Sequence, residues 1–374
     1  MGDYEIVCAD VVKWAESYSG DPFHAIICDP PYNLDTITHR FGKSDSAPAK
    51  HGRDGRFARL SKHWRGETWD TDVAFHVETW RALMKVLLPG AFIFAYGGAR
   101  CYWRMAAAMD QAGLVIHPNL FCWAQGQAMP YAHQVSRLAG NHGWQNKQSG
   151  WEGYYHGRGT LKPSVEPIIL AQNPFGNSPI EDILTYGAGA YNVDGGRFSQ
   201  ENRWPGTLVL VHSERCTDGS CQFDCPVALL EDKANYFYHT NWAMEVFERV
   251  INVDPVIYAN KVDKKERRAG LDNDADHPTL KPIGLNFYLA KLLLPPRKMS
   301  PRRLLVPFSG VASEMIGGLY AGWDQVVGVE IDQHYCELAD RRTKYYLDLC
   351  ENNCVPLEVL KGVYYKEQNE QVFE

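Results

Sequence analysis

The 374-residue sequence lacks any run long and apolar enough to cross a membrane as a helix. Its first residues also lack the charged, apolar and small-residue segments of a secretory signal peptide. There is no excess of basic residues, because the formal net charge is -7. That balance does not by itself indicate nucleic-acid binding, although a local basic patch would be enough for it. We therefore expect a cytoplasmic protein that does not associate with a membrane.

The cysteines do not form a framework of closely spaced pairs. The ten cysteines are scattered along the chain, and Cys8, Cys28 and Cys122 fall within apolar runs. This distribution indicates buried, reduced thiols, which are typical of a protein from a reducing compartment.

Strand and helix patterns alternate at both ends of the chain. Short apolar runs at residues 4–8 and 23–28 flank a helical pattern at residues 11–18. This order predicts a strand-helix-strand unit and therefore a parallel sheet. Alternating patterns return at residues 303–349. The predicted fold class is α/β with a Rossmann-like sheet, and the length allows either two domains or one domain with a large insertion.

The middle of the chain is less regular. Helices at residues 72–88 and 100–112 and a buried strand at residues 91–96 continue the alternation, which then ends near residue 124. Residues 125–270 are irregular and rich in aromatic residues, glycine and asparagine. We interpret that range as an inserted recognition region.

One short stretch gives the clearest chemical signal. The apolar run at residues 23–28 ends abruptly in Asp29, Pro30, Pro31 and Tyr32. Two prolines cannot continue a strand ladder, so the strand must end there. Asp29 and Tyr32 then lie at the carboxyl end of a strand, where open α/β sheets bind their ligands. A strand followed by a plain Pro-Pro turn is the alternative interpretation.

A second motif lies near the end of the chain. An apolar strand at residues 303–306 leads into a turn and then a helix, and the next strand at residues 325–329 closes with Glu330. The turn consists of Pro307, Phe308, Ser309 and Gly310. A glycine turn at a helix start, with an acidic residue about twenty positions on, is typical of a nucleotide site in which the acid binds ribose hydroxyls.

Basic residues gather between residues 36 and 66. This polar stretch contains eight lysines and arginines but only two acidic residues, both of them aspartates. A loop of this length is uncommon unless it has a function or is disordered. The first possibility is a solvated flexible loop. The second is a loop that contacts DNA phosphates through Arg53, Arg56 and Arg59.

A group of metal-ligand residue types lies within the irregular region. His212, Cys216, Cys221 and Cys225 fall within fourteen residues. Four such ligands could hold one structural zinc ion in a small knuckle. The spacing differs from the common Cys-x2-Cys pairs, so ordinary reduced thiols beside an unrelated histidine remain an alternative.

Together these motifs resemble the amino-methyltransferases of DNA, in particular the circularly permuted β group of phages and restriction-modification systems. In that group Asp-Pro-Pro-Tyr comes first, a target-recognition region follows, and the cofactor-binding Phe-x-Gly half comes last. Here the order is residues 29–32, then the irregular region, then residues 277–282 and 307–310. Weaker stretches that resemble the family are residues 87–90, 95–98 and 162–167. The chain departs from the family pattern at Val306, usually Asp, at Ala312, usually Gly, and at Glu314, usually Thr.

The resemblance implies a division of the chain. Residues 1–124, with the basic loop 36–66, would form the catalytic half of a methyltransferase domain. Residues 125–270 would be the inserted target-recognition region, residues 271–350 the cofactor-binding half, and residues 351–374 a tail.

The resemblance also implies S-adenosylmethionine as cofactor and names the residues of the site. Residues 29–32 would be catalytic. Glu330 would bind the ribose, Asp10 would lie near the adenine, and Lys281 and Thr279 near the methionine end. The full set of implied cofactor contacts is Asp10, Asp29, Thr279, Lys281, Pro307, Phe308, Ser309, Gly310, Glu330 and Ile331.

The chemistry of the motif fits an amino group on a base. The carboxylate of Asp29 and the carbonyl oxygen of Pro30 can each accept one amino hydrogen. This draws the nitrogen toward tetrahedral geometry and directs its lone pair at a sulfonium methyl group, while Tyr32 can stack on the base. The target base must be flipped out of double-stranded DNA, because its amino group is inaccessible in the duplex.

Asp-Pro-Pro-Tyr is commoner among the adenine enzymes of this family, so we expect methylation of adenine N6. Cytosine N4 methylation is the main alternative. A methyltransferase of RNA or of a protein amide, and an inactive DNA-binding relative, are further alternatives. The recognition sequence, and the choice between a monomer and a homodimer, stay open.

Overall fold

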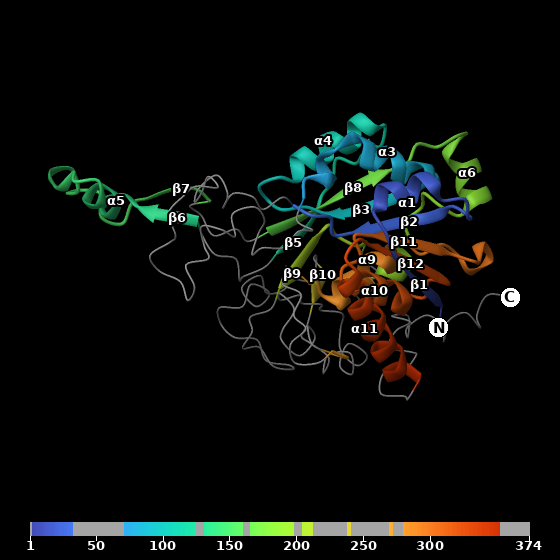
Figure 1. Cartoon of the computed structure of the whole chain (residues 1–374). Coiled ribbons are helices and arrows are strands. Elements are labelled where there is room, and N and C mark those ends of the chain that lie inside the picture. Colours follow the sequence, from blue (N-terminus) through green and yellow to red (C-terminus); the bar gives the residue numbers. More distant parts are fainter. Residues whose placement is uncertain are drawn as a thin grey trace.

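The main feature of this computed structural model is a ten-stranded sheet with helices on both faces (Figure 1). The residues that the structure describes are 2–32, 71–124, 131–159, 165–197, 204–211, 238–240, 269–271 and 280–351. The strand order is β1-β12-β11-β2-β3-β8-β5-β9-β10, and β4 pairs with β8 beside this path. The bounds are β1 Asp3–Cys8, β2 Phe23–Cys28, β3 Leu87–Tyr96, β4 Val115–Ile116, β5 Phe121–Ala124, β8 Val165–Gln172, β9 Leu208–Val211, β10 Tyr238–Thr240, β11 Arg303–Pro307 and β12 Gln325–Glu330.

The two ends of the described chain meet in the parallel part of the sheet. Neighbouring pairs among β1, β12, β11, β2 and β3 are all parallel. Strand β11 pairs with β2, so that Leu304 lies opposite Ala25 and Leu305 opposite Ile26. Every residue of β2 is buried, as expected for a parallel strand covered on both faces. The predicted α/β class with a Rossmann-like sheet is confirmed.

Helices cover both faces of this sheet and divide the apolar core in two. The bounds are α1 Val11–Ser17, α3 Val77–Lys85, α4 Tyr102–Ala112, α6 Pro179–Tyr186, α9 Ile283–Leu293, α10 Ser313–Ala321 and α11 Gln333–Glu351. Successive residues of a strand point to opposite faces. Ile26 accordingly belongs to the core formed with α1, α3 and α4, whereas Ile27 belongs to the core formed with α9 and α10.

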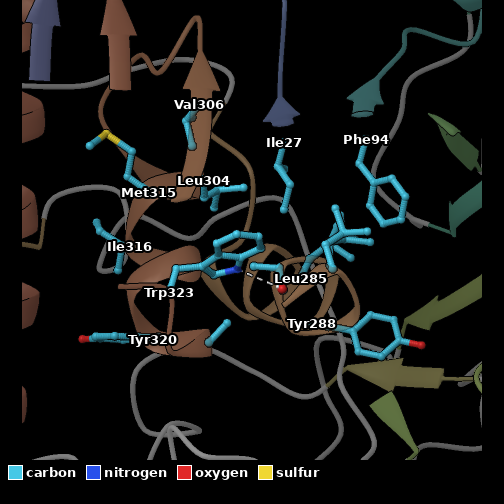
Figure 2. Packing of buried hydrophobic residues seen from close by; sticks show 14 of the residues in the cluster. Ile27, Phe94, Leu285, Tyr288, Leu304, Val306, Met315, Ile316, Tyr320 and Trp323 are labelled. Atoms are coloured by element: carbon cyan, nitrogen blue, oxygen red, sulfur yellow. Dashed lines mark hydrogen bonds between the residues drawn. The ribbon is translucent and has the colours of Figure 1, made fainter. Parts of the chain in front are cut away.

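The second core fixes α9 against α10. Figure 2 shows Ile27 and Phe94 from the sheet above Leu285 of α9, with Met315 of α10 to their left. The indole of Trp323 is fully buried there, and its Nε1 donates to the carbonyl oxygen of Ala290 at 3.0 Å. This bond satisfies a polar group that would otherwise be costly to bury. The packing holds the starts of both helices beside the sheet, where the site lies.

Several strand ends meet at one edge of the sheet. Asp29 follows β2, Glu330 ends β12, and the glycine turn follows β11. Strand β8 runs antiparallel to β3, with Ile168 opposite Tyr96, so β8 begins at the edge of the sheet where β3 and the strands parallel to β3 end. Glu166, near the start of β8, therefore lies at the same edge as Asp29.

Part of the range predicted as an inserted region contributes a strand to the main sheet. Strand β8 lies between β3 and β5, in the middle of the strand order. Its residues Ile168, Ile169, Leu170 and Ala171 are all buried. This apolar run is enclosed by prolines at 163, 167 and 174, which hid its strand character in the sequence. Residues 165–172 are thus part of the sheet, and the remaining domain boundaries stay a prediction.

Two local predictions differ from the structure. The helix expected at residues 72–88 is a 3-10 turn at Val73–Phe75 followed by α3, and β3 begins at Leu87 rather than residue 91. The strand passes through Gly90, whose φ is 77° and whose Cβ position would fall 2.3 Å from the Phe175 ring. Glycine permits this positive φ and this close approach within the strand.

The prediction of buried cysteines is wrong for Cys8. The six cysteines in the described ranges are free thiols, and Cys28, Cys336 and Cys350 are buried as expected. Cys122 is partly buried, and Cys8 is exposed. The reason is that β1 is the edge strand of the sheet, where alternate side chains face solvent.

A small separate sheet projects from the main body (Figure 1). It pairs β6 Tyr131–Gln134 with β7 Tyr155–Gly159 in antiparallel register, with α5 Val135–Asn141 and the 3-10 turn Gln145–Lys147 between them. Further 3-10 turns lie at Asp194–Gly196 and Arg297–Met299. Among the described helices, none has the length and apolar character needed to span a membrane.

Candidate active site

Asp29, Tyr32, Glu166 and Lys281 form one hydrogen-bonded cluster at the edge of the sheet. The Nζ of Lys281 lies 2.7 Å from Asp29 Oδ2 and 3.0 Å from Glu166 Oε1. The hydroxyl oxygen of Tyr32 lies 2.7 Å from Asp29 Oδ1 and 2.9 Å from Glu166 Oε1. A hydroxyl has one proton, so Tyr32 donates to one carboxyl group at a time. Lys281 thus holds Oδ2 of Asp29, and Tyr32 holds Oδ1 when it donates to Asp29 rather than to Glu166.

Burial and charge oppose each other in this cluster. Burial alone would lower the pKa of Lys281, whose side chain is 6% exposed, but the carboxylates of Asp29 and Glu166 raise it above the usual value. Burial raises the pKa of Asp29, and the ammonium group of Lys281 opposes that rise. The pKa of Tyr32 is raised well above its usual value by burial and by the carboxylates of Asp29 and Glu166. Lys281 is therefore charged, and Tyr32 keeps its proton.

Two aromatic rings enclose the ammonium group. Lys281 Nζ lies 5.3 Å from the ring centre of Tyr32 and 5.0 Å from that of Tyr96, within the range of cation–π contacts. A Cβ at Gly98 would fall 3.2 Å from Cδ2 of the Tyr32 ring. Gly98 therefore leaves room for the ring, and the cluster fixes its hydroxyl end.

The glycine turn after β11 has a strained backbone held by Glu330. Phe308 has φ 59° and Ala312 has φ 70°, a left-handed conformation that costs non-glycine residues about 1–3 kcal/mol each. The amide N–H of Gly310 donates to Glu330 Oε2, and that of Asp332 donates to Oε1, each at 2.9 Å. Burial raises the pKa of Glu330, and these N–H groups oppose the rise. Glu330 thus shapes the turn in addition to any role with a ligand.

A cavity of about 340 Å³ connects the cluster with the glycine turn. This volume is in the range of small-molecule sites. It brings together most residues that the sequence predicted for the site, namely Asp10, Asp29, Pro30, Pro31, Tyr32, Lys281, Phe308, Ser309, Gly310, Glu330 and Ile331. Pro307, the last residue of β11, is not among the residues that line the cavity.

Asp10 has a structural contact that the sequence pattern did not indicate. It caps the N-terminus of α1, where its Oδ1 accepts from the amide groups of Val12 at 3.1 Å and Lys13 at 3.0 Å. Such caps contribute about 1 kcal/mol to helix stability. Asp10 also lines the cavity, so the cap fixes its carboxylate beside the space where a ligand would lie.

Glu166 and Glu314 are among the acidic residues of the site that were not predicted as site residues. Glu166 belongs to a stretch that resembles the family, and this was the available signal for it. Glu314 was noted only as a departure from the family pattern, yet it lines the cavity and is 4% exposed. Both depend on tertiary contacts, because Glu166 meets Lys281 only through the position of β8 between β3 and β5.

Other predicted residues lie outside the described ranges. These are Thr279, the basic loop 36–66 with Arg53, Arg56 and Arg59, and the proposed zinc ligands His212, Cys216, Cys221 and Cys225. Within the described ranges, no cluster of three or more His, Cys, Asp or Glu residues could hold a metal ion.

No protein-family model and no curated protein matches this sequence. Solved structures do match over nearly the whole chain. The M1.HpyAVI complex with S-adenosylmethionine is 11% identical, covers 91% of this chain and 98% of its own, and has a TM-score of 0.43. A putative DNA modification methylase from Thermus thermophilus is 14% identical, with 92% and 96% covered and a TM-score of 0.41. The cytosine-N4-specific PvuII DNA methyltransferase is 11% identical, with 96% and 94% covered and a TM-score of 0.47.

Two of these similar structures carry the names of a DNA modification methylase and a DNA methyltransferase. Their identities and TM-scores are too low to transfer a function. The assignment below therefore depends on the side chains of this site.

Proposed function

We propose that this protein transfers a methyl group from S-adenosylmethionine to an amino group of a base in DNA, and specifically to adenine N6. The observation that supports this most strongly is the convergence of two motifs on one cavity. Asp29 follows β2 and Glu330 ends β12, and both line the same space of about 340 Å³. One motif suits the activation of an amino group, and the other suits a nucleoside cofactor.

The residues at the glycine-turn end of the cavity fit such a cofactor. Asp10, Glu330 and Asp332 provide carboxylate oxygens for hydroxyl and amino groups. Val11, Phe308, Ile331 and Tyr335 provide apolar surface for a planar base. When bound, S-adenosylmethionine would supply an electrophilic methyl group on its sulfonium sulfur.

The residues at the other end would act on the target base. Asp29 and the carbonyl group of Pro30 would accept the two hydrogens of the amino group, which directs the nitrogen lone pair toward the cofactor. Lys281 opposes the effect of burial on the Asp29 pKa, and so favours the charged, accepting form of the carboxylate. Tyr32, held by its hydroxyl group, would contact the face of the flipped base. Much of the rate gain would come from positioning the two reactants in line.

We expect N6-methyladenine to be the product, and a tritiated-methyl assay on double-stranded DNA, RNA and protein should label DNA alone. Mass spectrometry of the digested DNA then identifies the modified base. N4-methylcytosine without N6-methyladenine would contradict the choice of base and leave a DNA methyltransferase. Label in RNA or protein but not in DNA would contradict the choice of substrate.

Glu330 should matter for cofactor binding. In Glu330→Gln, an amide NH₂ group must face one of the two N–H donors that the carboxylate now accepts. We expect the Kd of S-adenosylmethionine to rise about 10- to 100-fold, the equivalent of one charged hydrogen bond. Isothermal titration calorimetry measures this, with Glu337→Gln on the exposed side of α11 as control. Equal affinities of the two variants would remove Glu330 from the cofactor site.

The permuted motif order, the target-recognition role of the irregular region, the DNA-contacting basic loop and the structural zinc belong to the same proposal. The position of the early strand β2 beside the late strand β11 supports the permuted order. The basic loop and the zinc ligands lie outside the described ranges, whereas the irregular region is described in part. The roles proposed for all three depend on the sequence alone.

A further inference from the structure

Glu314 is a buried acid on the wall of the cavity. It is the second residue of α10, is 4% exposed and lines the cavity together with Asp29 and Lys281. Asn286 Nδ2 donates to Glu314 Oε1 at 3.2 Å, and Asn286 Oδ1 accepts from the hydroxyl of Tyr96 at 2.8 Å. Tyr96 thereby orients the amide so that it presents its donor to Glu314, and the Glu314 carboxyl group is held in place.

The charges around Glu314 do not balance. Asp29, Glu166 and Glu314 bring three carboxyl groups into this part of the site, and Lys281 is hydrogen-bonded to Asp29 and Glu166. Within the described residues, Glu314 forms no ion pair, and Lys281 acts on it only at longer range. A buried carboxylate without a cation is costly. The other groups that act on it are its own backbone N–H, Asn286, Tyr96 and the buried thiol of Cys28, and none of them is a cation.

A proton takes the place of the missing cation. Burial raises the pKa of Glu314 to about 7, and the nearby carboxylate of Asp29 adds to the rise. In the absence of ligand, Glu314 is therefore protonated in a large fraction of molecules near neutral pH. If the protein itself supplied a cation to Glu314, the carboxylate would stay charged near neutral pH.

We propose that Glu314 is the anion that receives a positively charged group of the cofactor, and that it exchanges its proton for that cation when the cofactor binds. This inference rests on the proposed function, because the cation is the sulfonium or the α-ammonium group of S-adenosylmethionine. Glu314 stands where the resembling family usually has threonine, so this contact would be particular to chains that carry the acid. A purely structural acid, bonded only to Asn286, would not respond to a ligand.

Isothermal titration calorimetry of the full chain with S-adenosylmethionine tests the exchange. Between about pH 6 and about pH 7.5 the affinity should rise roughly five- to tenfold, because the charged form of Glu314 becomes the major one. This range stays below the titration of the ligand's own amino group, near pH 8. Near pH 7, titrations in two buffers with different ionisation enthalpies should report net proton release. In Glu314→Gln both effects should disappear, whereas Glu337→Gln should keep them.

S-adenosylhomocysteine, which keeps the α-ammonium but has a neutral sulfur, separates the two cations. If Glu314→Gln weakens both ligands equally, the ammonium is the partner; if it weakens only S-adenosylmethionine, the sulfonium is. Unchanged affinities and an unchanged pH profile in Glu314→Gln would overturn the inference while leaving the proposed function in place. If that variant does not fold, the absence of proton release from the wild-type protein overturns it instead. Wild-type protein that binds neither ligand at any pH would count against the proposed function itself.

Discussion

Replacing Asp29 with alanine should abolish detectable methylation while S-adenosylmethionine still binds. Removal of one preorganised group that acts as charge develops typically costs on the order of 10²–10³ in turnover. The carboxylate would act mainly as the amino nitrogen changes geometry, so the loss should fall on kcat rather than on substrate binding. The assay is transfer of tritiated methyl to DNA, together with calorimetric binding of the cofactor.

The contacts of Asp29 call for an isosteric control. Asp29 is hydrogen-bonded to Lys281 and Tyr32, so alanine also disturbs two neighbours. Asp29→Asn keeps the size of the side chain and one acceptor oxygen, but it loses the negative charge that pairs with Lys281. If Asp29→Asn is as stable as the wild type but its turnover is as low as that of Asp29→Ala, the charge of the carboxylate is what catalysis requires. Near-normal turnover in Asp29→Ala would exclude Asp29 from the mechanism.

Replacing Lys281 with methionine should cause the largest loss of stability among the site variants. The substitution removes the cation that lies within 3.0 Å of two carboxyl groups, and those side chains are only 17% and 13% exposed. Breaking a buried pair from one side typically costs about 3–5 kcal/mol of unfolding free energy. Urea unfolding followed by tryptophan fluorescence measures the change.

The loss should depend on pH in a defined direction. Without Lys281, nothing opposes the effect of burial on Asp29, so the pKa of the Asp29 carboxyl group rises further in the folded state above its value in the unfolded chain. The folded state then binds more protons, so the stability of the variant falls as pH rises. The deficit should therefore be larger near about pH 8 than near about pH 5.

Lys344 provides a matched control for this experiment. Its Nζ lies 2.6 Å from Asp340 Oδ2, a distance close to that of the Lys281 pair, but its side chain is 63% exposed. Lys344→Met should cost less than about 0.5 kcal/mol, as is usual for exposed pairs. Equal losses in the two variants, or a Lys281→Met protein as stable as the wild type at both pH values, would mean that the buried cluster does not stabilise the fold.

The sequence alone determined the local features of this protein. The apolar run of β2 and the two prolines after it fixed the end of a strand and the position of Asp29, because burial and proline geometry act within a few residues. The same holds for the turn after β11, where glycine and an acid at a set distance predict its shape. The α/β class followed from the alternation of these patterns.

The tertiary structure alone decided which distant residues meet. Nothing in the local pattern places β8 between β3 and β5, because its neighbours depend on the sheet order. Only that order brings Glu166 to Lys281 and Asp29. Likewise, the packing of α9 against α10 brings Asn286 to Glu314. These contacts are hydrogen bonds across long sequence separations, and they are set by how layers pack rather than by the residues beside them in the chain.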